Sequence, residues 1–157
     1  MNALYPTPHY DRAGRHHYRA VFISDTHLAF CRTIDNCYEE NSSLILGTKG
    51  ARTDFLSDFL GSMSCDFLFL VGDIVDGWRL RKCWYWDAEH DRVIRHILRH
   101  ARNGTAVTYI PGNHDEMFRA WLPTAIDPHT LEVAGIALRN EATHVTADGK
   151  KLLVIHG

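Results

Sequence analysis

The chain has 157 residues, of which 45% are hydrophobic, and this length allows one domain with a buried core but not two ordinary domains. Its formal net charge of -2 at pH 7 excludes a long-range field that would draw the whole molecule to nucleic acid or to an anionic membrane, so we expect no nucleic-acid partner and only local membrane contact. The sequence shows no signal-peptide pattern, no apolar run of the about 18 residues that a membrane span needs and no C-x-x-C pair among its four cysteines, so we expect a cytoplasmic protein with reduced thiols.

An irregular leader rich in Pro, His and Tyr is expected over residues 1–18. After it, short apolar runs alternate with segments of helical spacing. The runs are rich in β-branched and aromatic residues and are typical of buried strands. They cover residues 19–24, 66–71, 105–110 and 151–156.

Two segments between these runs have the apolar spacing of helices. One extends from Phe55 to Met63, and the other extends from Val93 to Ala101 and ends at Asn103-Gly104. Strands that alternate with helices imply crossover connections, so the sequence predicts an α/β fold with a largely parallel sheet. Near the end, Asp148-Gly149 lies between two strand-like runs and predicts an antiparallel hairpin.

Polar residues follow the apolar run of each predicted strand. Their blocks are Ser24-Asp25-Thr26-His27, Gly72-Asp73-Ile74-Val75-Asp76, Pro111-Gly112-Asn113-His114-Asp115 and His156-Gly157. Because the carboxyl ends of strands in an open α/β sheet converge on one crevice, we expect two aspartates, two histidines and an asparagine to gather there. Such a set of oxygen and nitrogen ligands suits Mn²⁺, Fe²⁺ or Zn²⁺ better than Ca²⁺. Asp73 is the expected bridge, since its two oxygens can hold two cations about 3.5–4 Å apart, and Gly72 and Gly112 permit close backbone approach.

Each block alone also has a structural explanation. Asp25 could cap a helix, His27 could be a loop residue, and the aspartates of GDIVD could be turn residues. The GNHD block is harder to explain in this way, because Asn113 and His114 have no structural need to be adjacent. Three such blocks in this order, each after an apolar strand, together favour a metal site.

The blocks "SDTH", "GDIVD", "GNHD" and the terminal "HG" resemble those of the calcineurin-like metallophosphoesterases, over residues 19–157. The resemblance implies a four-layer α/β/β/α sandwich with two divalent metal ions at the strand ends, Mn²⁺ first, with Fe²⁺ or Zn²⁺ as alternatives. It also implies a role for seven residues of this chain: Asp25 and His27 on the first metal, Asp73 as the bridge, Asn113 and His156 on the second metal, His114 as the group that protonates the leaving oxygen or stabilises charge on the phosphate, and Asp76 as its outer partner.

Longer stretches narrow the resemblance. "LVGDIVDGWRLRKCWYW", "VTYIPGNHDE" and "HVTADGKKLLVIHG" are similar to a bacterial branch that includes UDP-2,3-diacylglucosamine pyrophosphatases, which cleave a sugar-nucleotide lipid during lipid A synthesis. This implies a phosphate-containing lipid substrate and peripheral contact with the cytoplasmic face of the inner membrane. Trp78, Arg79 and Arg81, with Asn113, would bind the substrate, since they offer apolar surface and donors for a diphosphate. The alternative is a solvated loop that leads into a helix whose aromatic residues pack inward.

Two departures from the family pattern stand out. Residues 29–46 interrupt the match after the first metal-binding block, and we expect them to be an insertion over the catalytic face. The sequence also has no later G-H-x-H block, whose histidines complete both metal spheres in the family. We therefore expect residues 19–157 to be the N-terminal part of a longer phosphoesterase domain, and the chain alone to be a weak or inactive catalyst.

Three functions follow from these patterns. The first is a dinuclear phosphoesterase that hydrolyses a phosphodiester or diphosphate bond, with UDP-2,3-diacylglucosamine as lead substrate. The second is a phosphoesterase that acts on nucleotides or nucleic acid. The third is a non-catalytic remnant that keeps the fold as a binding scaffold. The oligomeric state stays open.

Overall fold

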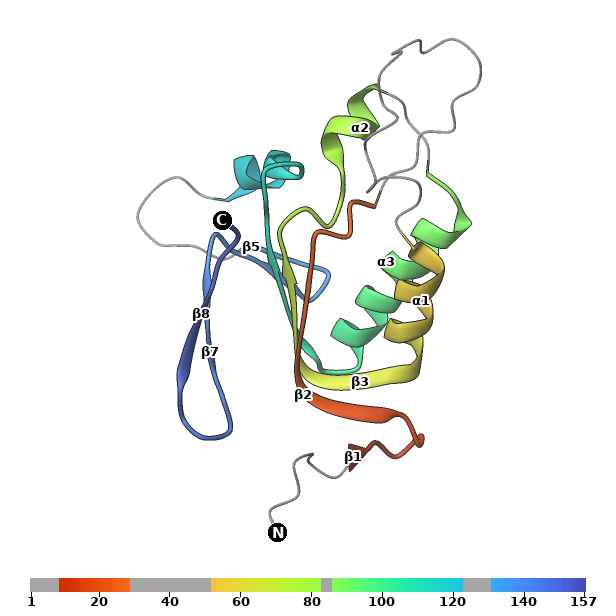
Figure 1. Ribbon diagram of the computed structural model, residues 1–157, viewed down its shortest axis with the longest axis vertical. Helices are drawn as coiled ribbons and strands as arrows, with labels where there is room; N and C mark the ends of the chain where they lie inside the picture. The colour runs from red at the N-terminus through yellow and green to blue at the C-terminus, as the bar shows by residue number, and fades with distance from the viewer. Residues whose placement is uncertain (1–8, 29–51, 83–85, 123–130) are drawn as a thin grey trace.

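A computed structural model describes residues 9–28, 52–82, 86–122 and 131–157, and the expected insertion at 29–46 lies outside them (Figure 1). The central sheet consists of β1 (His9–Tyr10), β2 (His16–Ser24), β3 (Met63–Val71), β4 (Ala106–Ile110), β5 (Leu131–Val133) and β6 (Ile136–Leu138). The strands lie in the order β1-β2-β3-β4-β6-β5. The four inner strands run parallel, while β1 and β5 pair antiparallel at the two edges. The predicted α/β fold is confirmed, with a sheet that is mixed because of its edges.

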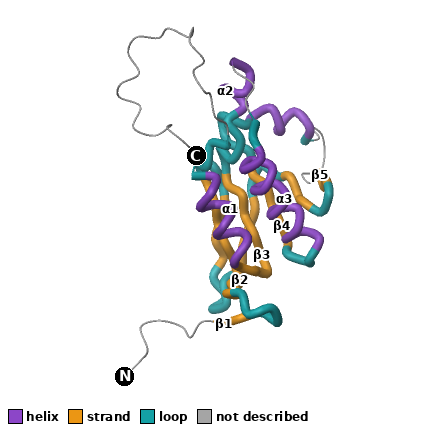
Figure 2. Tube along the Cα trace, turned by 90° about the vertical axis from the view of Figure 1, so that its right-hand side faces the viewer, coloured by secondary structure: helices purple, strands orange, loops and turns teal. Residues whose placement is uncertain are grey.

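Two helices cover one face of this sheet, α1 (Thr53–Ser62) and α3 (Ala88–Arg102) (Figures 1 and 2). The Asp87 side chain caps α3 by accepting hydrogen bonds from the amides of Glu89 and His90. The helix ends at Asn103, followed by Gly104 with φ of 92°. The shared core of helices and sheet includes Leu60, Leu68, Leu70, Val93 and Ile97.

A hairpin covers the opposite face of the sheet. Its strands are β7 (Ala142–Val145) and β8 (Lys151–Val154), which pair antiparallel and form a separate two-stranded sheet. Ala142 and Val154 pack against Phe69 of β3 and Ile110 of β4. Strand β3 is therefore apolar on both faces, as expected for a strand buried between two layers.

The hairpin prediction at Asp148-Gly149 is confirmed, and Gly149 has the positive φ, 82°, that such a turn requires. Other boundaries differ. Met63 belongs to β3 and not to the preceding helix, because the chain becomes extended directly after Ser62 with no turn residue between. The run at 151–156 is strand only to Val154 and lies outside the parallel sheet.

The N-terminal segment also differs from the prediction. Residues 9–18, expected as part of an irregular leader, include β1 and the beginning of β2, which pair through His9 with His17 and Tyr10 with His16. The short edge pair β5 and β6 was not predicted either. Within the described residues, no helix is both long and apolar enough to cross a membrane.

His100 of α3 makes the stability of this fold depend on pH. The residue is 3% exposed, and its Nε2 lies 2.9 Å from the Leu60 carbonyl oxygen, which it contacts as a donor. Burial lowers the pKa of His100 from its ordinary value of 6.5. Because the unfolded chain binds this proton first, we expect the free energy of unfolding to be fully present above pH 6.5 and to fall as the pH drops below it.

Urea denaturation at about pH 7.5 and about pH 5.5 measures this loss. The variant His100→Gln keeps a donor for Leu60 but cannot take up the proton, so it should lose less stability between the two pH values than the wild type does. An equal loss in both proteins would contradict the assignment to His100.

Candidate metal centre

The polar loops after β2, β3 and β4 lie side by side at the carboxyl edge of the central sheet. Hydrogen bonds continue the strand pairing into these loops: the Asp25 amide donates to the Gly72 carbonyl at 3.1 Å, and the His27 amide donates to the Asp73 carbonyl at 2.8 Å. On the other side, the Gly72 amide donates to the Ile110 carbonyl at 2.7 Å. The three predicted blocks are therefore held together by backbone contacts.

Three residues of these loops have a backbone conformation that side chains rarely adopt. Asp25, His27 and Asp73 have φ values of 53°, 45° and 53°. Among the described non-glycine residues, only Ala134 shares this left-handed region. Asp and His tolerate it better than most residues, yet each such position still costs about 1–3 kcal/mol. Strain of this kind gathers where a structure must aim side chains at one point.

The side chains do meet at one point. Ligand atoms of Asp25, His27 and Asp73 all lie within 4.8 Å of one another. Asp73 Oδ2 lies 3.9 Å from His27 Nε2 and 3.7 Å from His156 Nε2, while His156 Nε2 lies 3.9 Å from Asp25 Oδ1. Metal–ligand bonds of about 2.0–2.2 Å place neighbouring ligands roughly 3–4 Å apart. The donor types and their spacing therefore fit divalent ions.

Asp73 presents its two oxygens differently. Oδ1 accepts a hydrogen bond of 2.8 Å from the His114 amide, and a Cβ on Gly112 would collide with this oxygen. Oδ2 is the oxygen that faces His27 and His156. The prediction gave both oxygens of Asp73 to the metals. Oδ1 keeps a second lone pair beside its hydrogen bond to His114, so the bridging role of Asp73 stays a prediction.

The two loop glycines allow this packing. A Cβ on Gly72 would collide with the His156 ring, and one on Gly112 would collide with Asp73. At both glycines the group that approaches closely is a candidate ligand side chain of the same chain, and approach to a bound ligand stays a prediction. His156 comes from the end of β8, so the hairpin sheet supplies a side chain to the edge of the central sheet.

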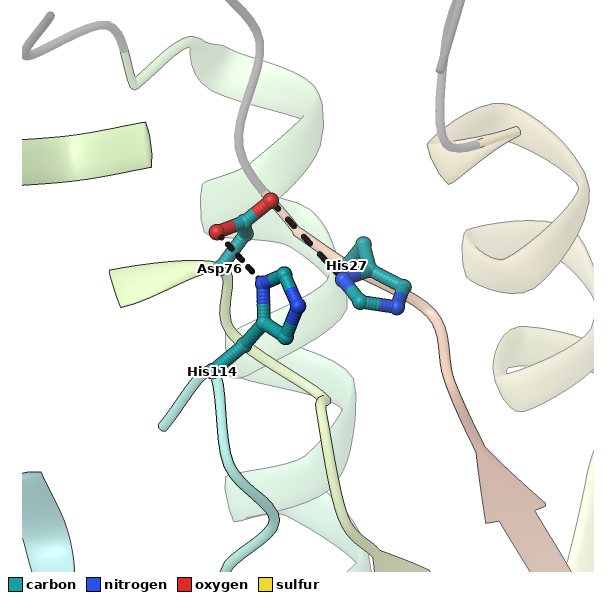
Figure 3. A group of neighbouring side chains, drawn as sticks. All are labelled: His27, Asp76 and His114. Atoms are coloured by element: carbon teal, nitrogen blue, oxygen red, sulfur yellow. Dashed lines mark hydrogen bonds and ion pairs between the residues drawn. The ribbon is translucent and has the colours of Figure 1, made fainter. Parts of the chain in front are cut away.

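A second group of side chains lies beside the first: His27, Asp76 and His114 (Figure 3). Asp76 is 2% exposed; its Oδ1 lies 3.0 Å from His114 Nδ1, and its Oδ2 lies 3.7 Å from His27 Nδ1. Burial raises the pKa of Asp76, but hydrogen bonds from His114 and from the Arg79 amide outweigh it and hold the pKa below its ordinary value. Asp76 thus holds the His114 ring by a hydrogen bond and faces the His27 ring from beyond hydrogen-bond distance.

His27 belongs to both groups. Its Nε2 faces Asp73 and its Nδ1 faces Asp76. A histidine that offers one nitrogen to a metal and donates the other to a carboxylate is the common arrangement around protein-bound metals. We therefore interpret Asp76 as a support for His27 and His114 and not as a third ligand of a separate site.

The remaining predicted residues differ in their placement. Asn113 is exposed between Gly112 and His114, and within the described residues its side chain makes no recorded hydrogen bond. Trp78, at the beginning of α2 (Gly77–Lys82), is 44% exposed and stacks on the His114 ring with centroids 4.2 Å apart. Arg79 Nε lies 3.5 Å from Asp76 Oδ2, and Arg81 is exposed on α2.

One buried acid at this edge had no role in the sequence analysis. Asp115 is 0% exposed and accepts hydrogen bonds from the amides of Ile74 and Gly112 and from the Tyr109 hydroxyl. Its only signal in the sequence was its place in the GNHD block.

The chain matches the family model described as "Calcineurin-like phosphoesterase" over residues 18–157. This match covers most of the sequence, so the chain belongs to the calcineurin-like phosphoesterase family. No curated protein and no solved structure matches the chain. Membership of the family, together with the clustered ligand groups, supports a metal-dependent phosphoester hydrolase.

Replacing Asp73 with Asn tests the metal centre without breaking the loop, because Asn also tolerates the left-handed backbone. The Asn side chain has no negative charge and one oxygen where Asp73 has two, so we expect Mn²⁺ affinity to fall by more than about tenfold. Calorimetric titration measures the affinity. Asp58→Asn, at an exposed position of α1, is the matched control and should bind as the wild type does. Equal affinity in all three proteins would contradict the assignment.

Proposed function

We propose that this chain is the catalytic part of a dinuclear phosphoesterase that hydrolyses a phosphodiester or diphosphate bond. The observation that carries the proposal is Asp73 Oδ2, which lies within 4 Å of the imidazoles of His27 and His156 in a chain of this family. We extend the proposal to the four-layer sandwich of the family, since α1 and α3 cover one face of the sheet and the hairpin covers the other.

In this proposal Asp25, His27, Asp73, Asn113 and His156 hold two divalent ions, Mn²⁺ in the first instance, with Fe²⁺ or Zn²⁺ as alternatives. When bound, such ions supply a hydroxide near neutral pH and neutralise charge on the phosphate. The positive φ values of Asp25 and Asp73 fix the direction of their carboxylates, so ion binding needs little reorganisation of these side chains.

His114 protonates the leaving oxygen or stabilises charge on the phosphate. Asp76 accepts from its Nδ1, so the opposite nitrogen of the ring is free to face a substrate. Trp78 stacks on the ring and limits its rotation. Two contacts therefore orient this imidazole, as proton transfer in a defined direction requires.

For the substrate we propose UDP-2,3-diacylglucosamine. Support comes from α2, where Trp78 exposes an apolar ring beside His114 while Arg81 and Lys82 present cationic groups nearby. Apolar and cationic groups together suit acyl chains and a diphosphate, and they suit peripheral contact with the inner membrane. A nucleotide substrate is the alternative. Release of phosphate from nucleotides, with no uridine product from the acylated sugar nucleotide, would favour it.

We also propose that residues 1–157 by themselves are a weak catalyst, because they lack the two histidines of the family's G-H-x-H block. Metal uptake is therefore a more sensitive readout than turnover. A non-catalytic scaffold predicts weak uptake, and tight binding of two Mn²⁺ ions would contradict it.

Replacement of His114 with Ala separates the proposed chemistry from metal binding. In an enzyme that also carries the family's later histidine block, we expect turnover of a chromogenic phosphodiester with Mn²⁺ to fall about 100-fold or more, because proton transfer or charge stabilisation is lost, while metal content stays the same. His96→Ala, a histidine that packs on Gly61 of α1, is the matched control and should keep wild-type turnover. Loss of one metal equivalent in His114→Ala would show that His114 is a ligand instead.

A further inference from the structure

Asp115 joins the two loops that carry most of the candidate ligands. Its Oδ2 accepts from the Ile74 amide at 2.9 Å, in the loop after β3, and its Oδ1 accepts from the Gly112 amide at 2.5 Å, in the loop after β4. The Ile74 amide directly follows Asp73, and Gly112 lies directly before Asn113. One carboxylate therefore sets the distance between these two loops.

A third contact holds the carboxylate itself. The Tyr109 hydroxyl donates to Asp115 Oδ2 at 2.5 Å, and a longer contact of 3.5 Å comes from the Val75 amide. Burial, the charge of Asp115 and this hydrogen bond together raise the pKa of Tyr109 well above its ordinary value, so the phenol keeps its proton and continues to donate. All partners of Asp115 are donors, which is the pattern that an ionised carboxylate accepts.

Burial makes these hydrogen bonds hard to replace. Asp115 is 0% exposed, and in the described part of the chain its side chain forms no ion pair. Backbone amides and one phenol therefore stabilise its charge by hydrogen bonding. Charge-assisted hydrogen bonds in such surroundings are short and directional, and loss of one partner leaves the others unsatisfied.

We propose that Asp115 is a positioning residue that sets the metal-ligand geometry by tying the loop after β3 to the loop after β4. The proposal rests on the proposed function, since positioning matters only if ions bind. Asp115 acts through Asp73, whose Oδ1 accepts from the neighbouring His114 amide, and not by touching substrate. Loss of a residue that holds metal ligands in place typically lowers the affinity for the metal about 10- to 100-fold.

The test compares Asp115→Asn with Val93→Ala. The Asn amide presents a donor where the Ile74 or Gly112 amide needs an acceptor, so the two loops should separate. Val93 is 0% exposed in the core between α3 and the sheet, and its truncation lowers stability without touching the loops. We expect Mn²⁺ affinity to fall about tenfold or more in Asp115→Asn and to stay unchanged in Val93→Ala, measured by calorimetry at a temperature where both are folded.

Tyr109→Phe is the milder variant, in case Asp115→Asn does not fold. It removes one donor and keeps the ring that packs on Phe118, so affinity should fall about two- to tenfold. Wild-type affinity in this variant, or in Asp115→Asn, would overturn the proposal. A common loss in Val93→Ala and Asp115→Asn would also overturn it, because the effect would then follow stability alone.

Amide exchange distinguishes failure of this proposal from failure of the proposed function. In the absence of ions, the amides of Ile74 and Gly112 should exchange faster in Asp115→Asn than in Val93→Ala. If the wild type binds none of Mn²⁺, Fe²⁺ and Zn²⁺, the proposed function is wrong, and the exchange rates still decide whether Asp115 ties the loops. Unchanged exchange at both amides would overturn the inference whatever the metal binding.

Discussion

The candidate centre depends on parallel pairing that continues beyond the ends of the strands. Where β2, β3 and β4 stop, the loops remain in register through the amides of Asp25, His27 and Gly72. This places three short polar blocks, far apart in the sequence, at one edge of one sheet. Backbone hydrogen bonds by themselves bring the three blocks together, so their convergence follows from the register of the sheet. Carboxylates and imidazoles need only be present at the correct positions to meet.

Side chains then divide the work. Asp25, Asp73 and His156 approach one another directly, while Asp76 and Asp115 are buried acids that fix other groups. Asp115 accepts hydrogen bonds from the loops after β3 and β4, and Asp76 accepts from His114 and from the Arg79 amide of α2. These donors are why both acids tolerate burial. The edge therefore has one group of side chains that carries the candidate metal ligands and a second group of buried acids that hold the surrounding loops in place.

The sequence predicted what depends on local pattern. Residues 67–71 are all apolar, so strand β3 was recognisable from the sequence. Asp148-Gly149, between two strand-like runs, predicted the hairpin. Strands of two or three residues are too short for any periodicity, and β1, β5 and β6 were missed for that reason. The role of Asp115 depends on two loops and Tyr109 meeting in space, and no spacing in the sequence encodes this meeting. The expectation that the carboxyl ends of the strands converge identified the main candidate ligands. The structure was needed to separate the side chains that face the candidate metal site from those that hold them in place.

His156 links the hairpin sheet to the central sheet at the candidate metal centre. The ring lies over Gly72, yet the chain that carries it belongs to the hairpin. The hairpin also contacts the central sheet through the cluster around Phe69 and Val154 and through the buried His144. An ion shared by His156 and Asp73 would fasten the hairpin to the sheet as well as prepare the chemistry. The candidate centre is therefore complete only when the hairpin is docked on the central sheet. Ion binding would stabilise the docked hairpin, and departure of the hairpin would open the site.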